Sequence, residues 1–159
     1  MIRTVRSGFA AKSPAAKSPA ALSLAAIALS ALVSGASVAA EGMAYTAAMT
    51  GASEVPANDA KGTGAVSATY DPASKTLTWK GSYDGLTGPV TAAHFHGPAA
   101  AGDNAGVLIP VTAAASPFEG SAKIDDAKAA DLAAGKLYVN IHTAANPKGE
   151  IRGQVMRAP

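Results

Sequence analysis

The sequence predicts an all-β protein, an antiparallel sandwich or barrel with one short helix. From Met43 onward, short runs of strand-forming residues are separated by Gly, Pro, Asp and Asn at intervals of about ten residues, which is typical of such folds. Helical periodicity is nearly absent over the same stretch. Together these patterns favour strands joined by tight turns.

Eight strands are expected in order along the chain. The turn at 71–75 contains Pro72, whose φ is preset, and it joins the second and third strands as a hairpin. In the strand near 136–142, apolar Leu137, Val139 and Ile141 alternate with polar residues, so one face packs inward. The predicted strands are at about residues 43–50, 62–70, 75–83, 90–97, 105–112, 117–124, 136–142 and 149–156.

One helix is expected between the last two of these regions. Asp125 or Asp126 can cap the run 127–134, and Gly135 can end it in a left-handed conformation. We expect this helix to cross one end of the sandwich and to present Leu132 to the core. It carries no residues that suggest chemistry.

Residues 1–40 have the three-part layout of a secretory signal peptide. A basic start is followed by an apolar run at 21–33 and by small residues that end at Ala40, where cleavage is expected. The apolar run is too short for a stable membrane span, although a retained anchor is the alternative. The protein is therefore expected to be periplasmic or secreted, with one mature domain at 41–159 and no membrane association after cleavage.

The composition of the mature part excludes several classes of partner and site. The leader holds four of the 13 basic residues and none of the 11 acidic ones, so the mature part has nine basic and 11 acidic residues and a net charge of −2. Without a basic stripe, nucleic acid and anionic membranes are not expected partners. Cysteine is absent, which excludes disulfides, iron–sulfur clusters and thiolate metal sites.

The three histidines are the strongest candidates for a functional site. His94 and His96 are two residues apart on a predicted strand, so their side chains share a face, and His142 lies on another predicted strand. Three neutral imidazoles with one coordination position open suit copper or zinc. The alternative is that these rings are structural and form hydrogen bonds with loop carbonyls such as those of residues 102–106.

Polar residues on the neighbouring strands are expected to support this site. Glu150 follows a seven-residue link after His142, so its carboxylate can accept the N–H of that imidazole, or equally pair with Arg152 or Lys148. Asn140 shares the polar face of the His142 strand, and Arg152 shares that of the Glu150 strand. All three are predicted to lie behind the metal ligands rather than to bind the metal.

Three separated motifs, in order, resemble the CHRD domain, first described in chordin. They are Ala92-Ala93-His94-Phe95-His96-Gly97-Pro98-Ala99, Leu137-Tyr138-Val139-Asn140-Ile141-His142-Thr143 and Asn146-Pro147-Lys148-Gly149-Glu150-Ile151-Arg152-Gly153-Gln154. The opening Gly51-Ala52-Ser53-Glu54-Val55-Pro56 and the helical Asp131-Leu132-Ala133-Ala134-Gly135 are also similar to that family. The resemblance covers nearly all of residues 43–156 and implies a Greek-key or immunoglobulin-like β-sandwich.

The resulting functional hypothesis is an exported, non-enzymatic binding protein that holds copper or zinc through His94, His96 and His142. One alternative is a module for protein or matrix interaction in which the histidines are structural. The other is a copper-dependent oxidoreductase, because the His-x-His strand also resembles, more loosely, copper/zinc superoxide dismutases. That likeness lacks a bridging histidine and the disulfide, which argues against a full dismutase site. The oligomeric state is left open.

Overall fold

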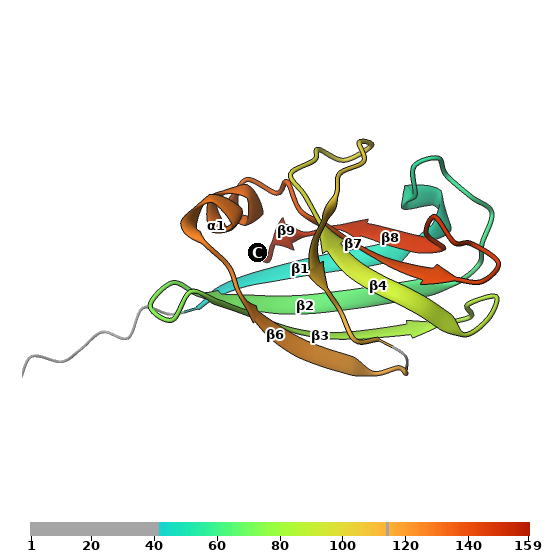
Figure 1. Ribbon diagram of the computed structural model, residues 1–159, viewed down its shortest axis with the longest axis horizontal. Coiled ribbons are helices and arrows are strands. Elements are labelled where there is room, and N and C mark those ends of the chain that lie inside the picture. Colours follow the sequence, from blue (N-terminus) through green and yellow to red (C-terminus); the bar gives the residue numbers. More distant parts are fainter. Residues whose placement is uncertain (1–41, 114) are drawn as a thin grey trace, which may run out of the picture. The chain divides into compact units, whose positions relative to one another are not determined.

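The computed structural model describes residues 42–113 and 115–159 of the chain (Figure 1). The predicted signal peptide at 1–40 lies outside the described residues. Within them, the all-β prediction is confirmed: one short α-helix and one short 3-10 helix accompany nine strands. No helix in this part of the chain is long and apolar enough to cross a membrane.

The strands agree with the predicted positions to within a few residues. The predicted eighth strand is divided into β8 and β9 at the buried Val155. The elements are β1 (Met43–Thr50), η1 (Gly51–Ser53), β2 (Thr63–Asp71), β3 (Thr76–Asp84), β4 (Val90–His96), β5 (Val107–Pro110), β6 (Phe118–Lys123), α1 (Asp126–Ala133), β7 (Tyr138–Thr143), β8 (Ile151–Gln154) and β9 (Met156–Arg157).

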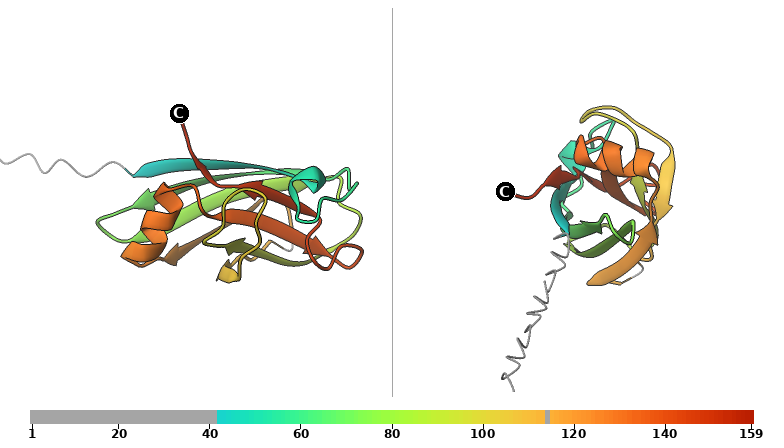
Figure 2. Two further views of the ribbon diagram at one scale, coloured as in Figure 1. Left: turned by 90° about the horizontal axis from the view of Figure 1, so that it is seen from above. Right: turned by 90° about the vertical axis from the view of Figure 1, so that its left-hand side faces the viewer.

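The strands form one antiparallel sheet that curls until it is nearly closed (Figure 2). The order is β5-β4-β7-β8-β1-β2-β3-β6, with β9 paired to β1. Because β4 pairs with β7 rather than with β3, the two histidine-bearing strands are neighbours although a helix and two strands separate them in sequence.

The core lies inside the curled sheet and is filled by alternate residues of nearly every strand. Trp79 of β3 and Phe95 of β4 meet edge to face, with ring centroids 5.1 Å apart, and so join opposite walls of the interior. Helix α1 contributes its buried Leu132, as expected. The side chain of Asp125 accepts a hydrogen bond from the backbone N–H of Lys128, and Gly135 follows with φ of +68°, so both predicted ends of the helix are confirmed.

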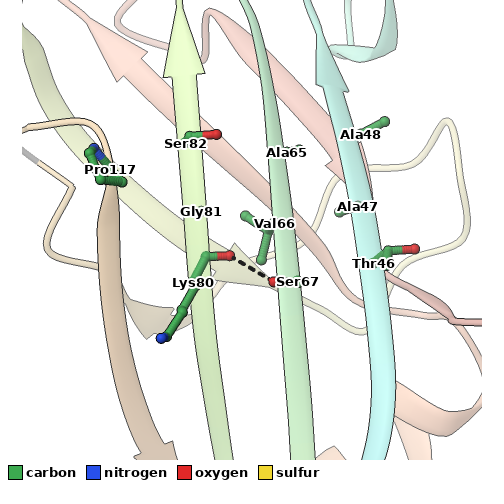
Figure 3. Close-up of a pocket in the computed structure, with 10 residues that line it drawn as sticks. All are labelled: Thr46, Ala47, Ala48, Ala65, Val66, Ser67, Lys80, Gly81, Ser82 and Pro117. Atoms are coloured by element: carbon green, nitrogen blue, oxygen red, sulfur yellow. Dashed lines mark hydrogen bonds between the residues drawn. The ribbon is translucent and has the colours of Figure 1, made fainter.

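The two halves of the sheet have different outer faces. Over β1, β2 and β3 the outer residues are small, among them Ala48, Ala65 and Ser82, and they form a shallow open surface (Figure 3). Over β4, β7 and β8 the outer residues are large and polar, and loops cover them. Asn140, Arg152 and His96 are therefore buried on the outer side of the sheet.

Candidate metal site

The pairing of β4 with β7 places the three histidines on one patch of the outer sheet face. His94 is opposite Asn140, and His96 is opposite Tyr138, in the antiparallel register. Phe95, between the two histidines of β4, points into the core and is fully buried. The side-chain alternation predicted for this strand is therefore confirmed, and it directs both imidazoles away from the core.

The three imidazole rings lie against one another. The ring centroids of His94 and His142 are 5.2 Å apart, those of His94 and His96 are 5.4 Å apart, and those of His96 and His142 are 6.4 Å apart. One ring nitrogen from each histidine can be chosen so that all three lie within 4.8 Å of one another. Together the three histidines therefore form a donor set that could hold a metal ion.

Backbone carbonyls hold two of the rings from behind. His96 Nδ1 is 3.0 Å from the carbonyl oxygen of Ala105, and His142 Nδ1 is 3.0 Å from that of Pro147. A carbonyl only accepts, so each Nδ1 donates its hydrogen. In the neutral ring this leaves Nε2 with a free lone pair, which is the form that binds a metal. The carbonyl contacts of the structural alternative therefore exist, and they also prepare two rings for ligation.

The third ring differs because its Nδ1 has no hydrogen-bond partner within the described residues. His94 Nδ1 is buried. A buried ring nitrogen without a partner normally costs free energy, so it points to a group that completes the site. The ring that carries this nitrogen lies beside two other imidazoles, so a cation is a group that could complete the site.

Burial keeps two of the histidines neutral. It lowers the pKa of His94, and the neighbouring His142 and His96 lower it further. Burial also lowers the pKa of His96, against the opposing hydrogen bonds to Ala105 and Asn140. At neutral pH both rings are therefore without charge, and no proton competes with a metal at their lone pairs.

A stack of planar groups supports His96 from the side. The ring of Tyr138 is parallel to the imidazole of His96, with an interplanar angle of 1° and centroids 4.8 Å apart. The guanidinium carbon of Arg152 lies 3.4 Å from the centroid of the Tyr138 ring. Arg152 is 2% exposed, and it donates hydrogen bonds to Asn104 Oδ1 and to the carbonyl of Asp103. Arg152 thus fixes the loop whose Ala105 carbonyl holds His96.

The predicted contact between Glu150 and His142 is wrong, because the carbonyl of Pro147 occupies the position at His142 Nδ1. The carboxylate of Glu150 instead accepts hydrogen bonds from the backbone N–H and the hydroxyl of Thr87 and from the hydroxyl of Thr143. Glu150 is fully buried in this network, which ties the segment after β3 to the β7–β8 hairpin. The error arose because sequence spacing gave the hairpin but not the direction of the side chain.

Asn140 and Arg152 lie closer to the imidazoles than Glu150 does. Asn140 Oδ1 is 3.0 Å from Nε2 of His96 and 3.0 Å from Nε2 of His142, so the amide sits between the two rings. Arg152 reaches the site through Tyr138 and through the loop at 103–105. Both side chains therefore lie beside the imidazole cluster.

Sequence reasoning missed Glu54, a buried carboxyl group next to this network. Glu54 is 7% exposed, and its Oε1 has no hydrogen-bond partner within the described residues. Burial raises its pKa to about 7, although the positive charge of Arg152 and hydrogen bonds from Val55 and Asn140 oppose the shift. Its place in the motif Gly51-Ala52-Ser53-Glu54-Val55-Pro56 was the available signal, but the motif gave it no role.

The sequence of this domain matches a known protein family. The CHRD domain family matches residues 45–155, which includes every strand that contributes to the site. The chain belongs to the CHRD domain family. No curated protein and no solved structure gives a match. The CHRD domain is a binding and interaction module, and in this chain three of its side chains could bind a metal.

Proposed function

We propose that this protein is an exported, non-enzymatic CHRD-domain protein that holds one copper or zinc ion through His94, His96 and His142. The observation that carries the proposal is the buried Nδ1 of His94, which has no hydrogen-bond partner among residues 42–113 and 115–159, on a ring beside two imidazoles whose Nδ1 atoms are bonded to carbonyls. Nitrogen donors without thiolates suit Cu(II) and Zn(II). Export rests on the signal-peptide pattern of residues 1–40.

The direct test is titration of the purified protein with Cu(II) and with Zn(II), followed by calorimetry and metal analysis after dialysis. The expected result is one ion per chain for wild type and strongly reduced uptake in His94→Ala and in His142→Ala. The matched control is Gln154→Ala, because Gln154 is a polar β8 residue whose amide binds the carbonyls of Ala99 and Gly135, away from the imidazoles. Absence of uptake by wild type, or equal uptake by all variants, contradicts the proposal.

A second candidate function is an interaction module in which the histidines are structural. The contacts of His96 and His142 with the carbonyls of Ala105 and Pro147 favour it, because they attach two loops to the sheet. In that case His96→Ala and His142→Ala lower the melting temperature equally with metal and with chelator. A melting temperature of wild type that rises with Zn(II) and falls with chelator supports the metal site instead.

A further inference from the structure

The amide oxygen of Asn140 lies between two of the imidazole rings. Its Oδ1 lies 3.0 Å from His96 Nε2 and 3.0 Å from His142 Nε2. Both Nδ1 atoms donate to backbone carbonyls, so Nε2 is the nitrogen of each ring that is left for a metal. The amide oxygen of Asn140 therefore lies next to two candidate donor atoms.

The spacing of these three atoms matches that of ligands around one metal ion. Metal–nitrogen bonds of 2.0–2.1 Å in a tetrahedral site place neighbouring donors about 3.3 Å apart. The observed separation of 3.0 Å between Oδ1 and each Nε2 is close to that value. Asn140 is 3% exposed, so its amide has little access to solvent.

We propose that Asn140 Oδ1 is the fourth ligand of the metal, so that the site has three imidazole nitrogens and one amide oxygen, all from this chain. The inference rests on the proposed function and makes it more specific. A site with four protein donors is closed, whereas a catalytic metal keeps one position for water or substrate. The protein then holds its ion without offering it to a substrate, and the oxygen donor favours Zn(II) or Cu(II) over Cu(I).

Cobalt(II) provides the test, because its visible absorption reports coordination number and its fourth ligand can be challenged with azide. The Co(II)-loaded wild-type protein is expected to show the strong absorption of a four-coordinate site and no change on addition of azide. In Asn140→Ala the fourth position is open, so azide changes the spectrum, and Co(II) and Zn(II) bind about 10- to 100-fold more weakly. Asn140→Asp keeps an oxygen donor and is expected to bind at least as tightly as wild type.

Controls separate this inference from folding and from the proposed function. Like Asn140→Ala, the control Gln154→Ala removes a side-chain amide, in this case from β8. It is expected to leave the Co(II) spectrum unchanged, both before and after addition of azide. An azide response in wild type, or affinity of Asn140→Ala equal to that of wild type, overturns the fourth ligand but leaves the three-histidine site. Absence of Co(II), Zn(II) and Cu(II) binding in wild type overturns both.

Discussion

The imidazole rings of His94 and His142 lie with their centroids 5.2 Å apart because β4 and β7 are neighbours in the sheet, not because the residues are near in sequence. A helix and two strands lie between them along the chain. The unfolded chain therefore has no such cluster, and any ligand that requires all three rings binds the folded state alone. Metal binding can therefore be measured from its effect on the free energy of unfolding, and the free energy of unfolding depends in turn on the metal concentration.

The first prediction is that Zn(II) stabilises the wild-type protein by an amount set by its free concentration. At a free concentration of 100 times the dissociation constant, the expected gain in the free energy of unfolding is about 2.7 kcal/mol. His94→Ala is expected to abolish this gain. Urea unfolding with buffered Zn(II) and with chelator provides the measurement, and an equal Zn(II) effect in both proteins contradicts it.

The second prediction concerns Arg152, whose buried guanidinium holds the loop at 103–105. Arg152→Met leaves the hydrogen-bond acceptors on Asn104 and Asp103 without their donor. The expected loss in the free energy of unfolding is about 1–3 kcal/mol. Arg152→Lys is expected to recover little of it, because an ammonium group cannot replace the planar guanidinium against Tyr138.

Chemical unfolding checks this prediction, with Arg157→Met as the control because Arg157 is an exposed residue of β9. The control is expected to change stability by less than about 0.5 kcal/mol. Hydrogen exchange adds a local measurement, since the amide of Ala105, which bonds to the Tyr138 hydroxyl, should lose protection in Arg152→Met. Similar losses of stability in the two Met variants would show that Arg152 has no special role.

The fold could be predicted because its signals are local. Alternation along Leu137, Val139 and Ile141 identified the core-facing side of β7, and Asp125 and Gly135 identified the ends of α1. The order of the strands carries no such local signal. The sequence therefore showed which residues share a strand face, but not that β4 would pair with β7.

The candidate site could be predicted only in part, for a related reason. Histidine is rare in this chain and its chemistry is specific, so the three imidazoles stood out. The groups that hold two of them are carbonyls of Ala105 and Pro147, and a backbone acceptor leaves no mark on residue identity. Glu150 was misplaced because its hydroxyl partner Thr87 is distant in sequence.

The third prediction follows from that correction of Glu150. Glu150→Gln replaces an acceptor oxygen with an N–H group that faces donors on Thr87 and Thr143, at an expected cost of about 1–3 kcal/mol. Metal affinity should change by less than about twofold, because the carbonyl of Pro147 holds His142. A carboxylate that oriented His142 would instead cost about 10- to 100-fold in affinity.

The pH dependence of this variant offers a separate check. Burial raises the pKa of Glu150, but hydrogen bonds from Thr143 and Thr87 outweigh it, and the net pKa is lowered. A lowered pKa in the folded state means that Glu150 contributes stability above its ordinary pKa and loses it as the pH falls through the folded value. The difference between wild type and Glu150→Gln should therefore shrink in acid, as urea unfolding at pH 3 to 7 can measure.

The fourth prediction uses Glu54, for which the sign is opposite. Its folded pKa of about 7 exceeds its ordinary value of 4.5, so between these values the unfolded chain loses a proton that the folded protein keeps. Wild type therefore loses stability through this group as the pH rises across that window. Glu54→Gln removes this titration. The free energy of unfolding of Glu54→Gln minus that of wild type should therefore be larger at pH 8 than at pH 4, by up to about 3 kcal/mol.

Urea unfolding of both proteins at pH 4, 5.5, 7 and 8, with chelator present, tests this expectation. Any titration that wild type and Glu54→Gln share cancels in the difference between the two curves. Glu119→Gln is the control, because its carboxylate is exposed on β6 and the substitution should leave the curve parallel to that of wild type. If the stability curve of Glu54→Gln is also parallel to that of wild type, the Glu54 carboxyl titrates normally. The loss of a buried carboxyl with a raised pKa must make the two curves diverge with pH.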